Sequence, residues 1–134
     1  MKHILTCSFG KDSIATALLA LQHGEPLDEL VYSEVMFSDT VSGELPEHKR
    51  FIYETAIPYF EKRGIPTRVL RGQKTYLDCF YHIVSRGNAE GKLASFPLTG
   101  RCSIQRDCKL PPIRTYQKTL PQDTVYYLGI AADE

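Results

Sequence analysis

The stretch "ILTCSFGKDSIATALL" (residues 4–19) joins a short apolar run to a helix-forming run through a small polar turn. Residues 3–7 predict a buried strand, because they are β-prone and lead directly into a turn. Beyond the turn, apolar residues recur at helical spacing, at Ile14, Ala17, Leu18 and Leu21. The unpaired N–H groups and the dipole at the start of such a helix favour an anion, so the turn is a candidate anion site.

The rest of the chain continues this alternation. We expect strands at residues 30–37, 65–72 and 123–134, helices at 47–64 and 75–87, and a surface loop at 88–101. Pro58 is expected to kink the first of these helices, and Gly64 to end it. Two short helices are expected in 102–119, broken at Pro111–Pro112.

Strands that alternate with helices at this spacing predict right-handed βαβ units. The expected fold class is therefore α/β, with a parallel sheet and helices on both faces. Four polar segments map to the carboxyl edge of this sheet, where ligands of such sheets bind: residues 8–13, 38–47, 71–76 and 129–134.

Length and composition narrow the classes of protein further. The 134 residues are expected to form one domain, and their formal net charge of zero gives no overall field for nucleic acid or a membrane surface. No run approaches the ~20 apolar residues of a membrane span, and the start of the chain lacks the apolar core of a signal peptide. The cysteines are too few and uneven for a disulfide scaffold, which favours a cytoplasmic protein with reduced thiols: Cys7, Cys79, Cys102 and Cys108.

The turn at Ser8–Ser13 has the residue types of a phosphate site. Gly10 permits close backbone approach, Lys11 adds a mobile positive charge, and the two serines add hydroxyl donors. Asp12 can cap the helix or help to hold a divalent metal ion such as Mg²⁺. The alternative is a plain turn, with Asp12 as an ordinary N-cap and Lys11 solvated. The Walker A and Gly-x-Gly-x-x-Gly patterns are both missing from this turn.

"SFGKDS" (residues 8–13) resembles the PP-loop, Ser-Gly-Gly-x-Asp-Ser, of the ATP-pyrophosphatase superfamily. Its Lys-Asp-Ser ending looks like the phosphoadenylyl-sulfate (PAPS) reductase branch. Phe9 departs from the pattern, since it stands where the first of the paired glycines usually lies, and its side chain must point away from the phosphates.

Three later segments are similar to that branch. "FSDTVSGELPE" (37–47) resembles the segment Asp-Thr-Gly-x-x-Phe-Pro-Glu, with matches at Asp39, Thr40, Pro46 and Glu47. "CSIQRDCKLPPIRTY" (102–116) is similar to Cys-Cys-x-x-Arg-Lys-x-x-Pro-Leu, and "YYLGIAADE" (126–134) resembles the family's closing strand. The resemblance implies a three-layer, Rossmann-like sheet of the adenine nucleotide alpha hydrolase type.

The resemblance also implies an adenine nucleotide, ATP or adenylyl sulfate, lying across the sheet edge. Its phosphates would lie on the loop formed by Ser8, Phe9, Gly10, Lys11, Asp12 and Ser13. Its adenine or ribose would border Phe37, Ser38 and Asp39, although Asp39 could instead hold its own loop as an Asx-turn residue. Relatives continue with further helices and distal cysteines, so we expect this chain to lack that extension, with Asp133 and Glu134 at the site edge.

The segment "GRCSIQRDCK" (100–109) places two cysteines among cations. Cys102 and Cys108 are candidate catalytic thiols or metal ligands, because nearby positive charge lowers the pKa of a thiol. Arg101, Arg106 and Lys109 are candidate clamps for a sulfate or second phosphate. The alternatives are ordinary thiols and solvated charges. In relatives, cysteines here can belong to an iron–sulfur cluster completed by a later pair that these residues do not include.

Three functions fit these features. A sulfonucleotide reductase would use a thiolate and a thioredoxin-like reductant, but the family's nucleophile lies beyond this chain. An ATP-pyrophosphatase would adenylate a substrate before sulfur transfer, as in nucleic-acid thiolation, and would use Asp12 or Asp39 beside a metal ion. A nucleotide-binding module without chemistry, acting as a sensor or a partner subunit, is the third, and the chain could form a homodimer. We expect these 134 residues to bind a nucleotide without reducing it.

Overall fold

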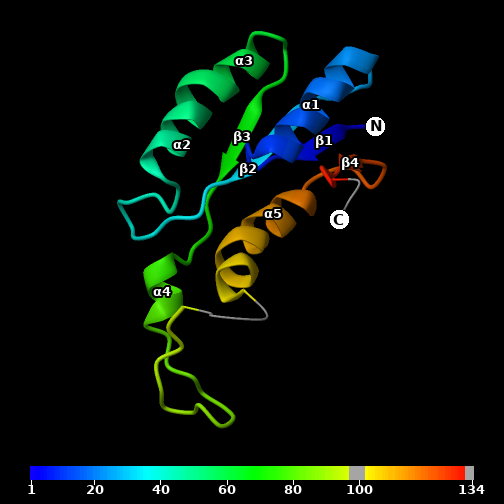
Figure 1. The fold of residues 1–134 in the computed structure, drawn as a ribbon. Coiled ribbons are helices and arrows are strands. Elements are labelled where there is room, and N and C mark those ends of the chain that lie inside the picture. Colours follow the sequence, from blue (N-terminus) through cyan, green and yellow to red (C-terminus); the bar gives the residue numbers. More distant parts are fainter. Residues whose placement is uncertain (97–101, 132–134) are drawn as a thin grey trace.

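Four parallel strands form the sheet in the computed structural model, which describes residues 1–96 and 102–131 (Figure 1). The strands are β1 (His3–Thr6), β2 (Glu29–Ser33), β3 (Thr67–Leu70) and β4 (Val125–Tyr127). They lie in the order β3-β2-β1-β4, and every neighbouring pair is parallel. The expected α/β fold with a parallel sheet is confirmed.

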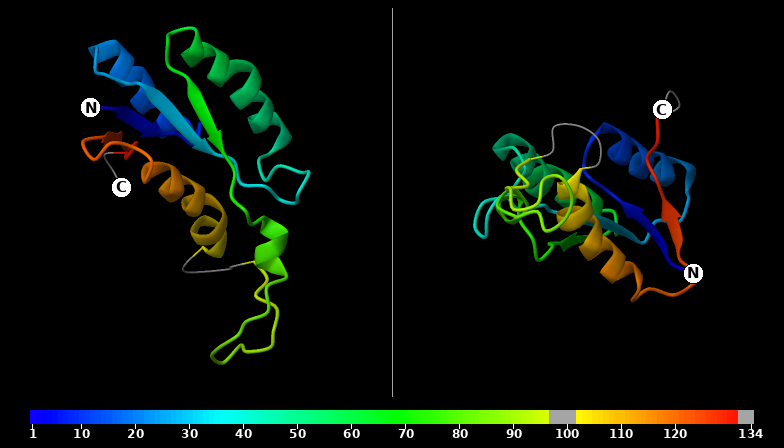
Figure 2. Two further views of the ribbon diagram at one scale, coloured as in Figure 1. Left: turned by 180° about the vertical axis from the view of Figure 1, so that it is seen from behind. Right: turned by 90° about the horizontal axis from the view of Figure 1, so that it is seen from below.

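The helices cover both faces of the sheet. They are α1 (Lys11–His23), α2 (Pro46–Phe51), η1 (Ile52–Ala56), α3 (Ile57–Glu61), α4 (Tyr76–Phe80), η2 (Gln105–Lys109) and α5 (Leu110–Gln117). Helices α1 and α2–α3 lie together on one face, and α5 lies on the other (Figure 2). This follows from right-handed crossovers, because the chain steps from β1 to β3 in one direction and then reverses to reach β4.

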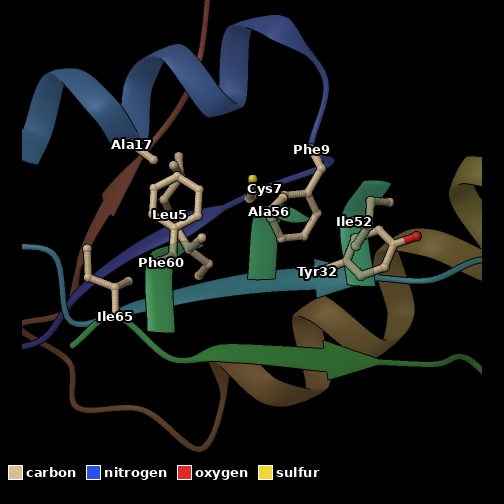
Figure 3. Packing of buried hydrophobic residues seen from close by; sticks show 10 residues of the cluster. Leu5, Cys7, Phe9, Ala17, Tyr32, Ile52, Ala56, Phe60 and Ile65 are labelled. Atoms are coloured by element: carbon tan, nitrogen blue, oxygen red, sulfur yellow. The ribbon is translucent and has the colours of Figure 1, made fainter. Parts of the chain in front are cut away.

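Successive side chains of each strand point to opposite faces of the sheet. Leu30 and Tyr32 of β2 join the core under α1 and α3. On the other face, Glu29 bonds to Tyr116 of α5, and Ser33 bonds to Lys109 of η2. The core cluster on the first face also contains Leu5, Cys7, Phe9, Ala17, Ile52, Ala56, Phe60 and Ile65 (Figure 3). This packing fixes where β1 ends and therefore where the polar turn begins.

The segment expected as a helix at 75–87 is helical only over Tyr76–Phe80. The prediction of the longer helix is wrong, because the apolar residues that follow have no face to pack against: Tyr81 is 62% exposed and Ile83 52%. Residues 81–96 instead form an arm that extends from the body (Figure 1). Its backbone hydrogen bonds run across the arm, and Ile83 is bridged to Leu93 in antiparallel fashion.

The break predicted at Pro111–Pro112 is wrong, and the helix around Pro58, where a kink is predicted, is also continuous. Helical structure runs without interruption through Pro111 and Pro112, and also through Pro58. A π-helical turn precedes each site, η2 before Pro111 and η1 before Pro58. The wider turn accommodates the missing N–H and the proline ring, so the predicted break is replaced by a local widening.

The other expected strands lie where the sequence predicts them, but they are shorter than expected. The strands expected at 30–37 and 65–72 are seen as the shorter β2 and β3, and β4 occupies only part of 123–134. Gly24 ends α1 and Pro46 begins α2. None of the helices in the described part of the chain has the length and apolarity that crossing a bilayer requires.

Candidate functional site

A cavity of about 1060 Å³ opens at the carboxyl end of the sheet, and its walls include the turn after β1 and the segment after β4. These two strands are neighbours at the point where the strand order reverses. Open α/β sheets bind ligands in the crevice at such a point. The cavity lining includes Ser8, Gly10, Lys11, Asp12, Ser13, Tyr32, Gly43, Glu44, Tyr76, Phe96, Cys102, Lys109 and Gly129.

The turn after β1 presents the start of α1 to the cavity. Gly10 is the N-cap residue, and within the described residues no side chain caps the helix. Ser13 Oγ donates to the Gly10 carbonyl at 3.2 Å and lies 3.4 Å from Ser8 Oγ. The alternative in which Asp12 is the N-cap is therefore not what the structure shows, and the first N–H groups of α1 face a space that an anion can enter.

Phe9 stands in the turn where the PP-loop pattern has a glycine. Its φ is 58°, in the left-handed region that glycine adopts without strain. The ring is 1% exposed and meets Tyr32 edge-on, with ring centroids 5.3 Å apart (Figure 3). Core packing thus holds Phe9 in a glycine-like conformation that costs about 1–2 kcal/mol, and its side chain points away from the cavity as expected.

Lys11 and Asp12 lie at the mouth of the cavity. Lys11 Nζ contacts Asp12 Oδ1 at 2.7 Å, and the lysine side chain is 82% exposed. An exposed pair between adjacent residues is weak, so a ligand phosphate can recruit Lys11 without losing a buried contact. Gly129 passes so close to α1 that an added Cβ would lie 2.9 Å from the Asp12 carbonyl oxygen.

An acidic group in the opposite wall was not found by sequence reasoning. Tyr32 donates from its hydroxyl to Glu44 Oε1 at 3.0 Å, and both residues line the cavity. Burial and then the Glu44 carboxylate raise the pKa of Tyr32, so this phenol remains a donor. Gly43 is required beside it, because a Cβ there would lie 2.7 Å from the Tyr76 ring.

Aromatic rings line the same cavity near the arm. The rings of Tyr76 and Phe96 meet edge-on, with ring centroids 5.9 Å apart. The ring centroid of Phe80 lies 4.9 Å from that of Phe96. Tyr76 is on α4, and Phe96 is at the end of the arm. A planar base can stack on such rings, but only the tertiary fold brings these two residues together.

Phe37, Ser38 and Asp39, expected beside adenine or ribose, do not line this cavity. Ser38 and Asp39 line a separate hollow of about 460 Å³. Ser38 Oγ accepts from the N–H groups of Thr40 and Val41, at 3.4 and 3.1 Å, so Ser38 holds the turn in which Asp39 lies. Phe37 packs against Tyr76 with ring centroids 6.2 Å apart and thereby reaches the cavity only indirectly.

The basic residues predicted to clamp a sulfate or second phosphate have different surroundings in the structure. Lys109 lines the cavity, and its carbonyl accepts from Ser33 Oγ at 2.9 Å. Arg106 is instead paired with Asp107 through two bonds of 2.8 Å. Arg101 lies outside the described residues, as do Asp133 and Glu134. Lys109 is thus the member of the predicted clamp that the structure places at the cavity.

The two candidate cysteines also have different surroundings. Cys102 is exposed and lines the cavity. Cys108 is buried 3.4 Å from the sulfur of Cys79, and burial together with that neighbour raises the pKa of Cys108 to about 12. A thiol that keeps its proton is a poor nucleophile, so the structure favours Cys102 over Cys108 for any chemistry in the cavity.

The cysteines of the described residues do not gather into one site. Over residues 1–96 and 102–131, the structure contains no group of three or more His, Cys, Asp or Glu side chains that could hold a metal ion. The four thiolates that a cluster needs are therefore not assembled in this part of the chain.

A buried glutamate supports the loop that carries Gly43 and Glu44. Glu34 is 0% exposed, and it accepts from Arg71 Nε at 2.9 Å and from Tyr53 and Ser42 at 3.1 Å each. Burial would raise the pKa of Glu34, but the Arg71 hydrogen bond and charge outweigh it and lower that pKa. The loop is therefore tied to β2 and β3 by an ionised carboxylate.

Comparison of the chain with models of protein families, with curated proteins and with solved structures finds no match.

Proposed function

We propose that this protein binds an adenine nucleotide, with the phosphates on the loop Ser8–Ser13, in the manner of a PP-loop protein of the PAPS reductase-like family. One observation carries the proposal: a cavity of about 1060 Å³ lies where the strand order reverses and opens on the N-terminus of the 13-residue α1. The proposal includes the three-layer, Rossmann-like class, for which the order β3-β2-β1-β4 gives support.

The groups around the cavity suit the parts of a nucleotide. Uncapped N–H groups, the hydroxyls of Ser8 and Ser13 and the mobile Lys11 side chain favour the phosphates. The rings of Tyr76 and Phe96 offer a surface for the base. This position of the base differs from the one that the resemblance implies beside Phe37.

For the reaction, we propose attack on a sulfonucleotide, with Cys102 as the candidate thiol. This replaces the sequence-based expectation of binding without reduction, because Cys102 is exposed and lines the cavity. Its thiolate would form an S–S bond to the sulfur of an adenylyl sulfate while the S–O bond to phosphate breaks. The nucleotide would leave with the electron pair, and a thioredoxin-like dithiol would then release sulfite. Lys109, in the same cavity, would bind the sulfate oxygens.

ATP cleavage is the second candidate, and a specific observation favours it. Asp12 and Glu44 both line the cavity, and Mg²⁺ is commonly held by one or two carboxylates together with substrate phosphates. These two residues would hold the ion, which neutralises phosphate charge when bound.

Calorimetry with ATP, adenylyl sulfate and its 3′-phosphorylated form tests the proposal. We expect binding of at least one nucleotide. If Lys109 holds sulfate, Lys109→Ala should weaken the binding of the two sulfonucleotides more than the binding of ATP. Parallel assays of pyrophosphate release and of thioredoxin-dependent sulfite release separate the two reactions. Absence of binding by all three nucleotides would overturn the proposed function.

A further inference from the structure

Two buried thiols meet under one wall of the cavity. Cys79 on α4 and Cys108 on η2 are 5% and 1% exposed, and their sulfur atoms are 3.4 Å apart. They form a small cluster with Ile104, against which Val35 and Tyr76 pack. Since a disulfide bond is about 2.05 Å long, the two sulfur atoms need to approach each other by little more than 1 Å to bond.

We propose that Cys79 and Cys108 are a redox-active pair that hydrogen peroxide oxidises to a disulfide linking α4 to η2. The sulfur of one cysteine attacks one peroxide oxygen and becomes a sulfenic acid, and the hydroxide that leaves takes up the proton of that thiol to give water. The sulfur of the other cysteine then displaces the sulfenic oxygen, which takes up the second thiol proton and leaves as water. Two thiols and one peroxide thus give one disulfide and two waters, and a dithiol reductant reverses the reaction.

The environment of the pair supports the proposal. Burial and the neighbouring Cys79 sulfur raise the pKa of Cys108, because a thiolate is disfavoured beside a second buried sulfur. Peroxide is small enough to reach a thiol that larger disulfide reagents cannot, and both sulfur atoms are buried. The partner of each thiol is fixed by packing, because α4 and η2 meet at this cluster.

The crosslink would reach the nucleotide cavity. Tyr76 lies one turn before Cys79 on α4, Lys109 follows Cys108 directly, and both residues line the cavity. Drawing the two sulfur atoms together therefore moves two walls of the cavity relative to each other. This coupling rests on the proposed function, whereas formation of the disulfide does not.

Intact mass measurement tests the disulfide. A variant with Cys7→Ala and Cys102→Ala retains only the pair. After peroxide it should lose the mass of two hydrogen atoms and take up no maleimide when denatured, and a dithiol should restore both reactive thiols. The matched variant that also carries Cys79→Ala should show no such loss.

Peptide mapping of the wild-type chain gives the same answer if those variants fail to fold. A Cys79–Cys108 linked peptide is expected after oxidation. Two thiols that still react with maleimide, or a bond between Cys102 and Cys108, would overturn the proposal.

Calorimetry with ATP on the reduced and oxidised chain tests the coupling. We expect the two Kd values to differ by about threefold or more, a change that such titrations resolve. Equal Kd values would overturn the coupling. Failure of both forms to bind ATP would overturn the nucleotide site and the coupling together, while the mass measurement decides the crosslink by itself.

Discussion

Glu29 at the amino end of the sheet and Lys11 at its carboxyl end are charged groups in opposite surroundings. At the amino end, Glu29 is buried and accepts from Lys2 Nζ and Arg68 Nε at 2.7 Å each and from the Tyr116 hydroxyl at 2.6 Å. At the carboxyl end, Lys11 is exposed and contacts only its neighbour Asp12 among the described residues.

This difference separates stability from binding. The amino end has a buried carboxylate whose partners are all supplied by the chain, so it holds the strands and α5 together. The loop Ser8–Ser13 at the carboxyl end has donors aimed at an open cavity, so a ligand is needed to complete its interactions. Substitutions of Glu29 and of Lys11 should therefore each change one property and leave the other unchanged.

The largest effect is expected from Glu29→Ala. It removes a buried carboxylate with three partners, and it should lower the free energy of unfolding by about 3 kcal/mol. Affinity for nucleotide should not change, because Glu29 lies at the opposite end of the sheet. Denaturant unfolding checks this, with the exposed Glu25→Ala as the matched control. A parallel loss of affinity would break the comparison.

Lys11→Ala should have the reverse effect. Loss of a charge-assisted bond to phosphate should weaken nucleotide binding by about 1–3 kcal/mol. Stability should stay within about 0.5 kcal/mol of the wild type, because the side chain is a surface group. Calorimetry and unfolding of the same sample measure both, with exposed Lys62→Ala as the control. Unchanged affinity would remove the loop from the site.

Acid should destabilise the protein through its buried glutamates. Burial would raise the pKa of Glu29, but hydrogen bonds from Lys2, Tyr116 and Arg68 outweigh it and lower that pKa. A lowered folded-state pKa gives stability that is present above the unfolded-state pKa, about 4.3, and is lost as the pH falls through the folded-state value. Unfolding at a series of pH values should show a smaller acid loss in Glu29→Gln, and an unchanged loss would contradict this.

The smallest effect is expected from Lys2→Ala. Arg68 and Tyr116 remain on Glu29, and the Lys2 side chain is partly exposed, so the loss of stability should be about 1 kcal/mol or less. Thermal unfolding of Lys2→Ala and of Glu29→Ala compares the losses of stability in the two variants. If the two variants lose equal stability, the partners of Glu29 are not redundant.

Local patterns predicted the strand, turn and helix at residues 4–19, because the apolar periods change within a few residues and Gly24 marks the end of α1. The opposite wall of the cavity could not be predicted. Glu44, Tyr76 and Phe96 come from a loop, α4 and the arm, and only packing brings them together. The contact of Cys79 with Cys108 depends in the same way on where the chain turns after Phe80.

An ATP titration of the ¹⁵N-labelled protein, followed residue by residue by NMR, tests most directly that the carboxyl end of the sheet is the nucleotide site. We expect the backbone amide signals of Ser8–Ser13 and Gly129 to shift first and most, while those of Glu29 and Arg68 at the amino end stay in place. Shifts centred on the amino end or on the arm, or no shifts at saturating ATP, would contradict this expectation.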